Sequence, residues 1–408
     1  MREVSSGCHN FCRRWDPLVV LAKYNKIEFQ SLGFEDYMKI AVIYGGKTGE
    51  HEVSQVSASS VARNLNTEKH SVSLISITKA GEWFLQPDAE LKRIKDDEKA
   101  ILSDAATDTR VAVIPGGGVI SGLCVVRNGK ISPLETDIVF PVLHGTYGED
   151  GLPQGLFEMA ELPYCGCDVM SSAVSMDKEK TKQIWQTAGL SVVPYITVRR
   201  TDREDEEAFS AILKRSERDF EWPVFIKPCK AGSSVGAGKA TSKEEFIAAV
   251  DEALLWDDKI LVEPFVEARE IECSVTGFRD ITSYIPGEII PSHEFYDYDA
   301  KYIDPDGAAL RIPADLDDEK IREVRDIAIK AFKALDGCGF SRIDFFLDKK
   351  TGKFYLNEIN TIPGFTNISM FPKLCEASGL PYDELLEKLM MLGIERFNAM
   401  RSLKTSRK

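Results

Sequence analysis

Two segments near the C-terminus, residues 342–347 and 354–360, predict a β-hairpin that carries acidic side chains. Both alternate apolar and polar residues, and they flank a polar turn. Folding about the middle of that turn sets Asp344 opposite Glu358, with their Cβ atoms about 5 Å apart. Two carboxylates this close repel each other unless a cation lies between them.

The neighbours of this acidic pair leave two interpretations. The two-residue period of a strand places Asn360 on the face of Glu358, and Arg342 on the face of Asp344. Arg342 could neutralise the acids on a solvated surface. Carboxylate and amide oxygens, however, are the ligands of Mg²⁺, which also binds substrate phosphates. The amide of Asn360 and the Asn-Thr-Ile-Pro-Gly sequence that begins there favour a metal site made of Asp344, Glu358 and Asn360.

A glycine-rich segment at 232–238 follows a predicted strand, 222–228, in which Lys227 stands near the end. Glycines let backbone N–H groups approach a phosphate closely, and Ser233 and Ser234 add further donors. The spacing is not that of a Walker A loop, because Ser233 stands where that motif needs its first glycine. A flexible surface loop is the alternative interpretation of this segment.

Two further polar segments come directly after buried strands. Residues 144–151, with three glycines, follow the predicted strand 137–143, and Glu50 follows the predicted strand 40–44. Ligands of open parallel sheets bind at the carboxyl ends of the strands. The segment that begins at His144 carries more polar groups than a plain turn needs, which indicates a function. A lone Glu50 in a first helical turn is more often a partner of the helix dipole.

Two other features invite a chemical interpretation. Residues 296–302 combine aromatic, acidic and lysine side chains, which is typical of a lid or an interface. Cys229 lies close to Lys227, but no histidine accompanies it in the sequence. We therefore interpret Cys229 as a buried thiol rather than a nucleophile.

The elements that must position these residues alternate between strands and helices from Met38 onward. Such alternation predicts an α/β fold with a parallel sheet and helices on its faces, and residues 81–135 predict short strands and loops added at a sheet edge. No G-x-G-x-x-G motif follows the first strand, which argues against a dinucleotide-binding dehydrogenase. The other predicted strands are 72–78, 260–262 and 270–276, and the predicted helices are 53–64, 176–188, 317–335 and 382–398.

Composition excludes several classes of protein. The 408 residues carry a net charge of −14, which argues against nucleic acid as a partner. No apolar run approaches the length of a membrane span. Nine cysteines without a repeated spacing indicate reduced thiols in a cytoplasmic protein rather than a disulfide framework or a zinc site. Residues 1–37 show no periodicity, and we interpret them as a mis-called start or a disordered preface.

Taken in order, these segments resemble the D-alanine–D-alanine ligase family of ATP-grasp enzymes, from Met38 to the last predicted helix. The resemblance implies an N-terminal parallel-sheet preATP-grasp domain, followed by a two-part ATP-grasp fold. The implied domains are 38–167, 168–266 and 267–408, with 1–37 unmatched. The blocks that carry the resemblance are 45–54, 144–151, 172–178, 226–236, 295–302, 341–344 and 357–366.

The resemblance also implies roles for single residues. It assigns ATP binding to Lys178, Lys227, Ser234, Glu263, Phe265, Val266 and Glu270. It assigns catalysis to Glu50, Ser233, Tyr302, Arg342 and the backbone N–H of Gly364, with Tyr302 on a mobile lid. It assigns D-alanine binding to His144, Glu149, Lys301 and Ser369. It agrees with the hairpin argument in assigning Asp344, Glu358 and Asn360 to magnesium.

The implied function is the ATP-dependent ligation of two D-alanine molecules for peptidoglycan precursors, through an acyl phosphate. Two Mg²⁺ ions would assist, with Mn²⁺ as a substitute, and the enzyme would be a cytoplasmic homodimer without nucleic-acid or membrane partners. The intact Tyr-Asp-Tyr-Asp-Ala-Lys-Tyr pattern at 296–302 favours D-alanine at both subsites. The alternatives are a D-alanine–D-lactate or D-alanine–D-serine ligase of the same fold, and a catalytically silent nucleotide-binding scaffold.

Overall fold

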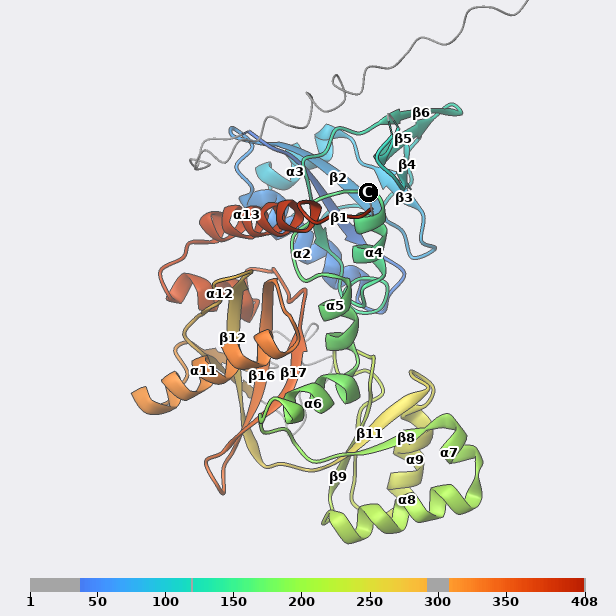
Figure 1. Ribbon diagram of the computed structural model, residues 1–408, viewed down its shortest axis with the longest axis vertical. Helices are drawn as coiled ribbons and strands as arrows, with labels where there is room; N and C mark the ends of the chain where they lie inside the picture. The colour runs from blue at the N-terminus through green and yellow to red at the C-terminus, as the bar shows by residue number, and fades with distance from the viewer. Residues whose placement is uncertain (1–36, 119, 292–307, 407–408) are drawn as a thin grey trace, which may run out of the picture. The chain divides into compact units, whose positions relative to one another are not determined.

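The computed structural model describes residues 37–118, 120–291 and 308–406. Backbone contacts divide the chain between Tyr37 and Met38, and the elements discussed below all belong to the unit Met38–Lys408. Three sheets organise them (Figure 1). Within the described ranges, no helix has the length and apolar character that crossing a membrane requires.

The first sheet has seven strands in the order β6-β5-β4-β3-β2-β1-β7. Strand β1 pairs in parallel with both β2 and β7, whereas β3 to β6 add an antiparallel edge. The predicted parallel sheet is therefore confirmed for β2, β1 and β7 at one end of the sheet, and the predicted edge insertion at 81–135 is confirmed as well. The strands are β1 (Lys39–Gly45), β2 (Ser71–Ile77), β3 (Trp83–Leu85), β4 (Arg110–Ile114), β5 (Gly122–Arg127), β6 (Lys130–Pro133) and β7 (Ile138–Val142).

Helices from both ends of the chain close the core of this sheet. Val42 of β1 and Phe140 of β7 share one apolar cluster with Leu385 and Leu389 of the last helix. The predicted helices at 53–64 and 382–398 are confirmed, while the helix at 88–96 lies in a charged run that did not predict one. The helices are α2 (His51–Asn64), α3 (Asp88–Asp96), α4 (Leu152–Met159), α5 (Val169–Met176), α12 (Met370–Ala377) and α13 (Tyr382–Arg401).

The second sheet is antiparallel throughout, in the order β10-β9-β11-β8. It packs against helices through residues such as Ile226, Val262 and Phe246. Its strands are β8 (Ile196–Arg199), β9 (Val224–Pro228), β10 (Gly238–Ala240) and β11 (Lys259–Pro264), and the helices are α6 (Lys178–Thr187), α7 (Arg200–Glu204), α8 (Glu206–Asp219) and α9 (Lys243–Ala253).

The prediction of one helix over 176–188 is wrong at its start. Helix α5 ends at Met176, and α6 begins at Lys178. Asp177 separates them because it has an extended backbone and its carboxylate accepts the N–H of Lys180, which caps α6. This break sets Lys178 in the first turn of a new helix.

The third sheet carries the predicted hairpin, in the order β15-β14-β12-β16-β17, with β13 paired to β12. Helix α11 (Asp318–Ala334) covers it, and Phe332 of this helix shares an apolar cluster with Phe345 of β16. The predicted helix at 317–335 and the strand at 270–276 are confirmed. The strands are β12 (Ala268–Gly277), β13 (Thr282–Ser283), β14 (Gly287–Pro291), β15 (Ala308–Arg311), β16 (Gly339–Asp348) and β17 (Phe354–Asn360).

Each sheet lies within one of the predicted segments 38–167, 168–266 and 267–408. Helix α13 nevertheless belongs to the core of the first sheet. The division at 167/168 and 266/267 stays a prediction.

Candidate active site

One cleft of about 2420 Å³ collects the predicted site residues that the structure describes. Lys301, Tyr302 and the rest of the predicted lid lie outside the described residues. The cleft therefore unites segments from all three sheets, although the roles of its residues stay predictions. Its lining includes Glu50, His144, Glu149, Lys178, Lys227, Ser233, Ser234, Glu263, Phe265, Val266, Glu270, Arg342, Asp344, Glu358, Asn360, Gly364 and Ser369.

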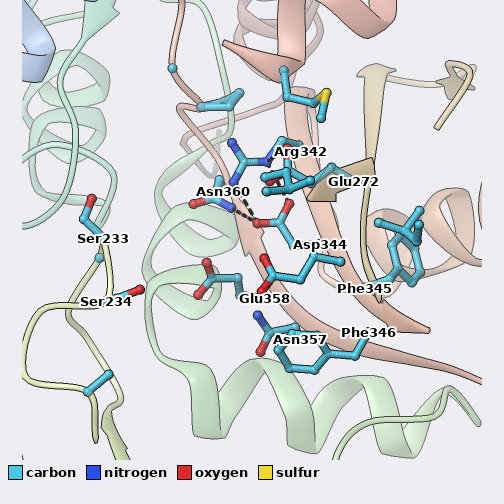
Figure 2. A pocket seen from close by; sticks show the side chains of 18 of the residues that line it. Ser233, Ser234, Glu272, Arg342, Asp344, Phe345, Phe346, Asn357, Glu358 and Asn360 are labelled. Atoms are coloured by element: carbon cyan, nitrogen blue, oxygen red, sulfur yellow. Dashed lines mark hydrogen bonds and ion pairs between the residues drawn. The ribbon is translucent and has the colours of Figure 1, made fainter. Parts of the chain in front are cut away.

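The hairpin β16–β17 presents the acidic pair to this cleft. Asp344 lies directly opposite Glu358, and Arg342 lies opposite Asn360, so the predicted register is confirmed. The pairing shifts after Asp344, which indicates a bulge between Asp344 and Phe345. Figure 2 shows the side chains of Asp344, Glu358 and Asn360 together, on the side of the hairpin that faces Ser233.

Each acid of the pair has a cationic partner. The Arg342 guanidinium forms two hydrogen bonds with Asp344, from Nε to Oδ1 and from Nη2 to Oδ2, each 2.7 Å long. Lys178 Nζ lies 3.2 Å from Glu358 Oε2. Arg342 thus pairs with Asp344, as the alternative to a metal site predicts, although both side chains line the cleft.

The donor set of this hairpin still fits a magnesium ion. Asn360 donates its Nδ2 to Asp344 Oδ2 at 3.0 Å, so its amide oxygen stays available to a ligand. Among the residues that the structure describes, no three His, Cys, Asp or Glu side chains cluster as a self-sufficient metal site. Two carboxylates and one amide match instead the way Mg²⁺ binds, with phosphate oxygens and water completing its shell.

Arg342 has a second carboxylate beside it. Glu272 of β12 lies opposite Asp344 in the sheet, and its Oε2 is 2.9 Å from Arg342 Nε. Burial alone would lower the pKa of Arg342, but Asp344 and Glu272 together hold this pKa well above its ordinary value. The guanidinium is therefore a permanent positive charge in the cleft.

Two lysines enter the cleft from the second sheet and its helix. Lys178 Nζ donates to the carbonyl oxygen of Ala231 at 2.9 Å. Although burial would lower its pKa, the carboxylate of Glu358 raises it. Lys227 Nζ donates to Asn357 Oδ1 at 3.0 Å and pairs with Glu263 Oε2 at 2.9 Å. Both ammonium groups are suited to neutralise phosphates.

The glycine-rich segment is a shaped loop that reaches Glu50. Ser233 and Ser234 both adopt left-handed backbones, with φ of 51° and 59°, which is a strained conformation for residues other than glycine. The Ser233 hydroxyl donates to the Glu50 carboxylate. Glu50 occupies the N-cap position of α2, but its side chain makes no capping hydrogen bond. Its carboxylate therefore lines the cleft at the N-terminus of α2.

His144 and Glu149 connect the end of β7 to the segment after β17. The His144 ring contacts the carbonyl oxygen of Ile362 and the hydroxyl of Ser57, each at 2.9 Å, and burial lowers its pKa. Glu149 accepts the N–H groups of Gly145 at 3.0 Å and Ile362 at 3.2 Å. Burial and the nearby Glu50 raise the pKa of Glu149 to about 8. Burial therefore favours the uncharged form of both side chains.

Gly364 and Ser369 lie at another part of the cleft, whereas Cys229 does not line it. Ser369 Oγ accepts the N–H of Thr366 at 3.0 Å, and an added Cβ at Gly364 would lie 2.7 Å from it. Cys229 is buried, as predicted, and burial raises the pKa of its thiol to about 12.

Three residues that support the site were not predicted. Lys182 lies one helical turn after Lys178, a spacing that could have identified it. Glu272 follows Glu270 at the two-residue period of β12, and Asn357 contacts Lys227. The local sequence around Glu272 and Asn357 carries no other signal.

The same chain matches known proteins along most of its length. Residues 39–167 match a family model described as the D-ala D-ala ligase N-terminus, and residues 184–391 match one described as the D-ala D-ala ligase C-terminus. The D-alanine–D-alanine ligase of Treponema denticola is 58% identical over 371 residues, which cover 91% of this chain and 100% of that protein. The D-alanine–D-alanine ligase of Treponema pallidum is 42% identical, with 90% of each chain covered.

Solved structures agree with these sequence matches. The D-alanine–D-alanine ligase of Coxiella burnetii has a TM-score of 0.75 at 34% identity, covering 90% of this chain and 97% of that one. VanG, a D-Ala:D-Ser ligase of Enterococcus faecalis, has a TM-score of 0.75 at 36% identity, covering 88% of this chain and 100% of that one.

Proposed function

This chain belongs to the D-alanine–D-alanine ligase family, and we propose a role in the ligation reaction for each residue of its cleft. The enzyme joins two D-alanine molecules in a reaction driven by ATP, and D-alanyl-D-alanine is a precursor of peptidoglycan. The roles below rest on the positions of the side chains in the cleft and on the family resemblance.

The first step is phosphoryl transfer. A carboxylate oxygen of the first D-alanine attacks the γ-phosphorus of ATP, the bond to the β,γ-bridging oxygen breaks, and ADP leaves with that electron pair. Lys178 and Lys227 neutralise the phosphates, and the loop at Ser233 and Ser234 covers them. The nucleoside binds beside Glu263, Phe265, Val266 and Glu270.

The second step is acyl transfer. The amine nitrogen of the second D-alanine attacks the carbonyl carbon of the acyl phosphate, and phosphate leaves from the tetrahedral intermediate. Arg342 and the backbone N–H of Gly364 stabilise the negative oxygen that forms. Exclusion of water protects the acyl phosphate from hydrolysis, which is the role we propose for the lid around Tyr302.

The two amino acids are bound on opposite sides of Arg342. Glu50, oriented by Ser233, holds the ammonium of the first D-alanine, with His144 and Glu149 on the same side. Ser369 and Lys301 receive the carboxylate of the second D-alanine.

Asp344, Glu358 and Asn360 would hold magnesium, or manganese in its place, together with phosphate oxygens. The ions, when bound, offset the negative charge that develops during phosphoryl transfer. Metal binding to Asp344 also requires Arg342 to share this carboxylate.

One observation supports the assignment of roles: a single cleft is lined by two lysines, by an acidic strand pair and by a glutamate that accepts a hydrogen bond from Ser233. The test is release of phosphate from ATP with D-alanine, repeated with D-lactate and D-serine as competing acceptors. We expect D-alanyl-D-alanine as the main product. No ADP formation with D-alanine would contradict the proposal.

A D-alanine–D-serine ligase is the second candidate, since VanG matches this chain at the same TM-score as the Coxiella enzyme. Preferential formation of D-alanyl-D-serine in the competition would favour that candidate. A cytoplasmic location and a homodimer are further proposals that rest on the family resemblance, and sedimentation of the purified chain tests the second.

A further inference from the structure

A second lysine of helix α6 lies behind the wall of the cleft. The Lys182 side chain is 0% exposed, and its Nζ lies 2.7 Å from Glu263 Oε1 and 3.2 Å from the carbonyl oxygen of Val193. The ammonium also lies 5.8 Å from the centre of the Tyr195 ring. Lys182 does not line the cleft, so it is too deep to touch a substrate there.

Glu263 is shared between two lysines. Its Oε1 pairs with Lys182, while its Oε2 pairs with Lys227 at 2.9 Å. The carboxylate itself is only 2% exposed. Burial would raise the pKa of Glu263, but the two ammonium groups lower it, so the group is an anion held between two cations.

The two lysines differ in what they can reach. Lys227 lines the cleft, and it also donates to Asn357 at 3.0 Å. Burial lowers the pKa of Lys182 to about 8, with Glu263 opposing this shift, so Lys182 is still mostly protonated at neutral pH. Lys227 is therefore placed to exchange Glu263 for a ligand in the cleft, whereas Lys182 is not.

A phosphate that binds Lys227 would compete with Glu263 for the same ammonium group. A buried carboxylate that loses its counter-ion carries a large desolvation cost. If Lys227 were the only counter-ion of Glu263, this cost would oppose the movement of Lys227 toward a phosphate. The fixed pair with Lys182 removes this difficulty, because Glu263 stays compensated when Lys227 turns away.

We propose that Lys182 is a positioning residue for the nucleotide: it is the permanent counter-ion of Glu263, which leaves Lys227 free to bind the phosphates of ATP. The inference rests on the proposed function of Lys227, and it goes beyond it by assigning a role to a side chain that no substrate touches. In this arrangement Lys182 controls phosphate affinity rather than binding of the nucleoside.

The test compares Lys182→Met with Lys180→Met, which removes an exposed lysine from the same helix. Calorimetric titrations with ADP and with adenosine, both with Mg²⁺ present, separate phosphate from nucleoside binding. We expect Lys182→Met to weaken ADP binding roughly tenfold, the usual effect of losing one charged hydrogen bond, and adenosine binding much less. Lys180→Met and Lys182→Arg should leave both affinities near those of the wild type.

A second comparison tests whether the effect of Lys182→Met requires the charge of Glu263. Glu263→Gln removes the charge that competes for Lys227, so adding Lys182→Met to Glu263→Gln should not weaken ADP binding further. A tenfold loss in that background would overturn the proposal. An equal loss of ADP and adenosine affinity in Lys182→Met, or no loss of either, would also overturn it. Wild-type chain that binds ADP but makes no dipeptide would refute the proposed function and leave this test intact.

Discussion

Ser233 donates its hydroxyl hydrogen to the Glu50 carboxylate, although 183 positions separate the two residues in the chain. The contact joins the loop after β9 to the start of α2. It requires two glycines, because an added Cβ would lie 2.8 Å from Glu50 Oε2 at Gly232 and 2.4 Å from it at Gly145. The position of Glu50 is therefore set by segments from two different sheets.

Replacing Gly145 should misplace this carboxylate. Gly145 has φ of +71°, so Gly145→Ala strains the backbone and also displaces Glu50. We expect kcat/KM for D-alanine to fall roughly tenfold, which corresponds to the loss of one charged hydrogen bond. Steady-state kinetics over a range of D-alanine concentrations measures this. Gly155→Ala is the control, because nothing lies within 4 Å of its added Cβ, and unaltered kinetics in Gly145→Ala would refute the argument.

Glu358→Gln should abolish ligation while the fold stays intact. The change removes one of the two carboxylates proposed to bind magnesium, and the side chain is 26% exposed, so little packing is lost. We expect phosphate release to fall about a hundredfold or more at every Mg²⁺ and Mn²⁺ concentration. Glu376→Gln, an exposed change on α12, is the control. Near-normal turnover of Glu358→Gln would refute the metal assignment.

A substitution at Gly236 tests whether the glycine-rich segment 232–238 must pack closely against Trp256 in order to bind ATP. Its φ is +69°, and an added Cβ would lie 2.4 Å from Cδ1 of Trp256, so Gly236→Ala should displace the loop and raise the KM for ATP. Gly189→Ala is the matched control, since Gly189 has φ of +75° but nothing within 4 Å. If both variants change the KM equally, backbone strain rather than contact with Trp256 is the cause. Adding Trp256→Ala to Gly236→Ala should restore part of the ATP affinity.

Glu149 should make stability depend on pH. Its pKa is raised from the ordinary 4.5 to about 8 by burial and by Glu50. Between these two values the folded chain holds a proton that the unfolded chain has released, so the contribution of Glu149 to the free energy of unfolding falls as the pH rises. The glutamine of Glu149→Gln is neutral at every pH, so this variant lacks the pH-dependent contribution of Glu149 to the free energy of unfolding.

The melting temperature of Glu149→Gln minus that of the wild type should therefore increase from pH 5 to pH 8. Thermal unfolding at four pH values in this window measures the difference. Glu395→Gln, an exposed change on α13, should show a constant difference. A flat difference for Glu149→Gln would mean that the buried carboxyl is ionised already at pH 5.

Local sequence was sufficient for some elements and not for others. Alternation and a short turn set the register of β16 and β17, because a slip of one residue would exchange the two faces of the hairpin. Residues 88–96 are mostly charged and did not predict α3, since only Ile94 of this helix is buried and Leu91 is partly buried against the same core. Asp177 divides the predicted helix at 176–188, because its carboxylate caps α6. An aspartate is a common N-cap residue, so the sequence does contain a signal for this boundary.

The sequence by itself determined the family and the strand pair with Asp344 and Glu358, because the motifs and the hairpin depend on residues close together in the chain. Tertiary structure alone decided which distant groups meet. The Ser233 contact with Glu50 requires the first and second sheets to bring strand ends together, and the sharing of Glu263 between Lys182 and Lys227 requires helix α6 to pack beside β9 and β11. Burial then sets which of these charges is fixed and which can exchange partners, and burial is a property of the folded chain.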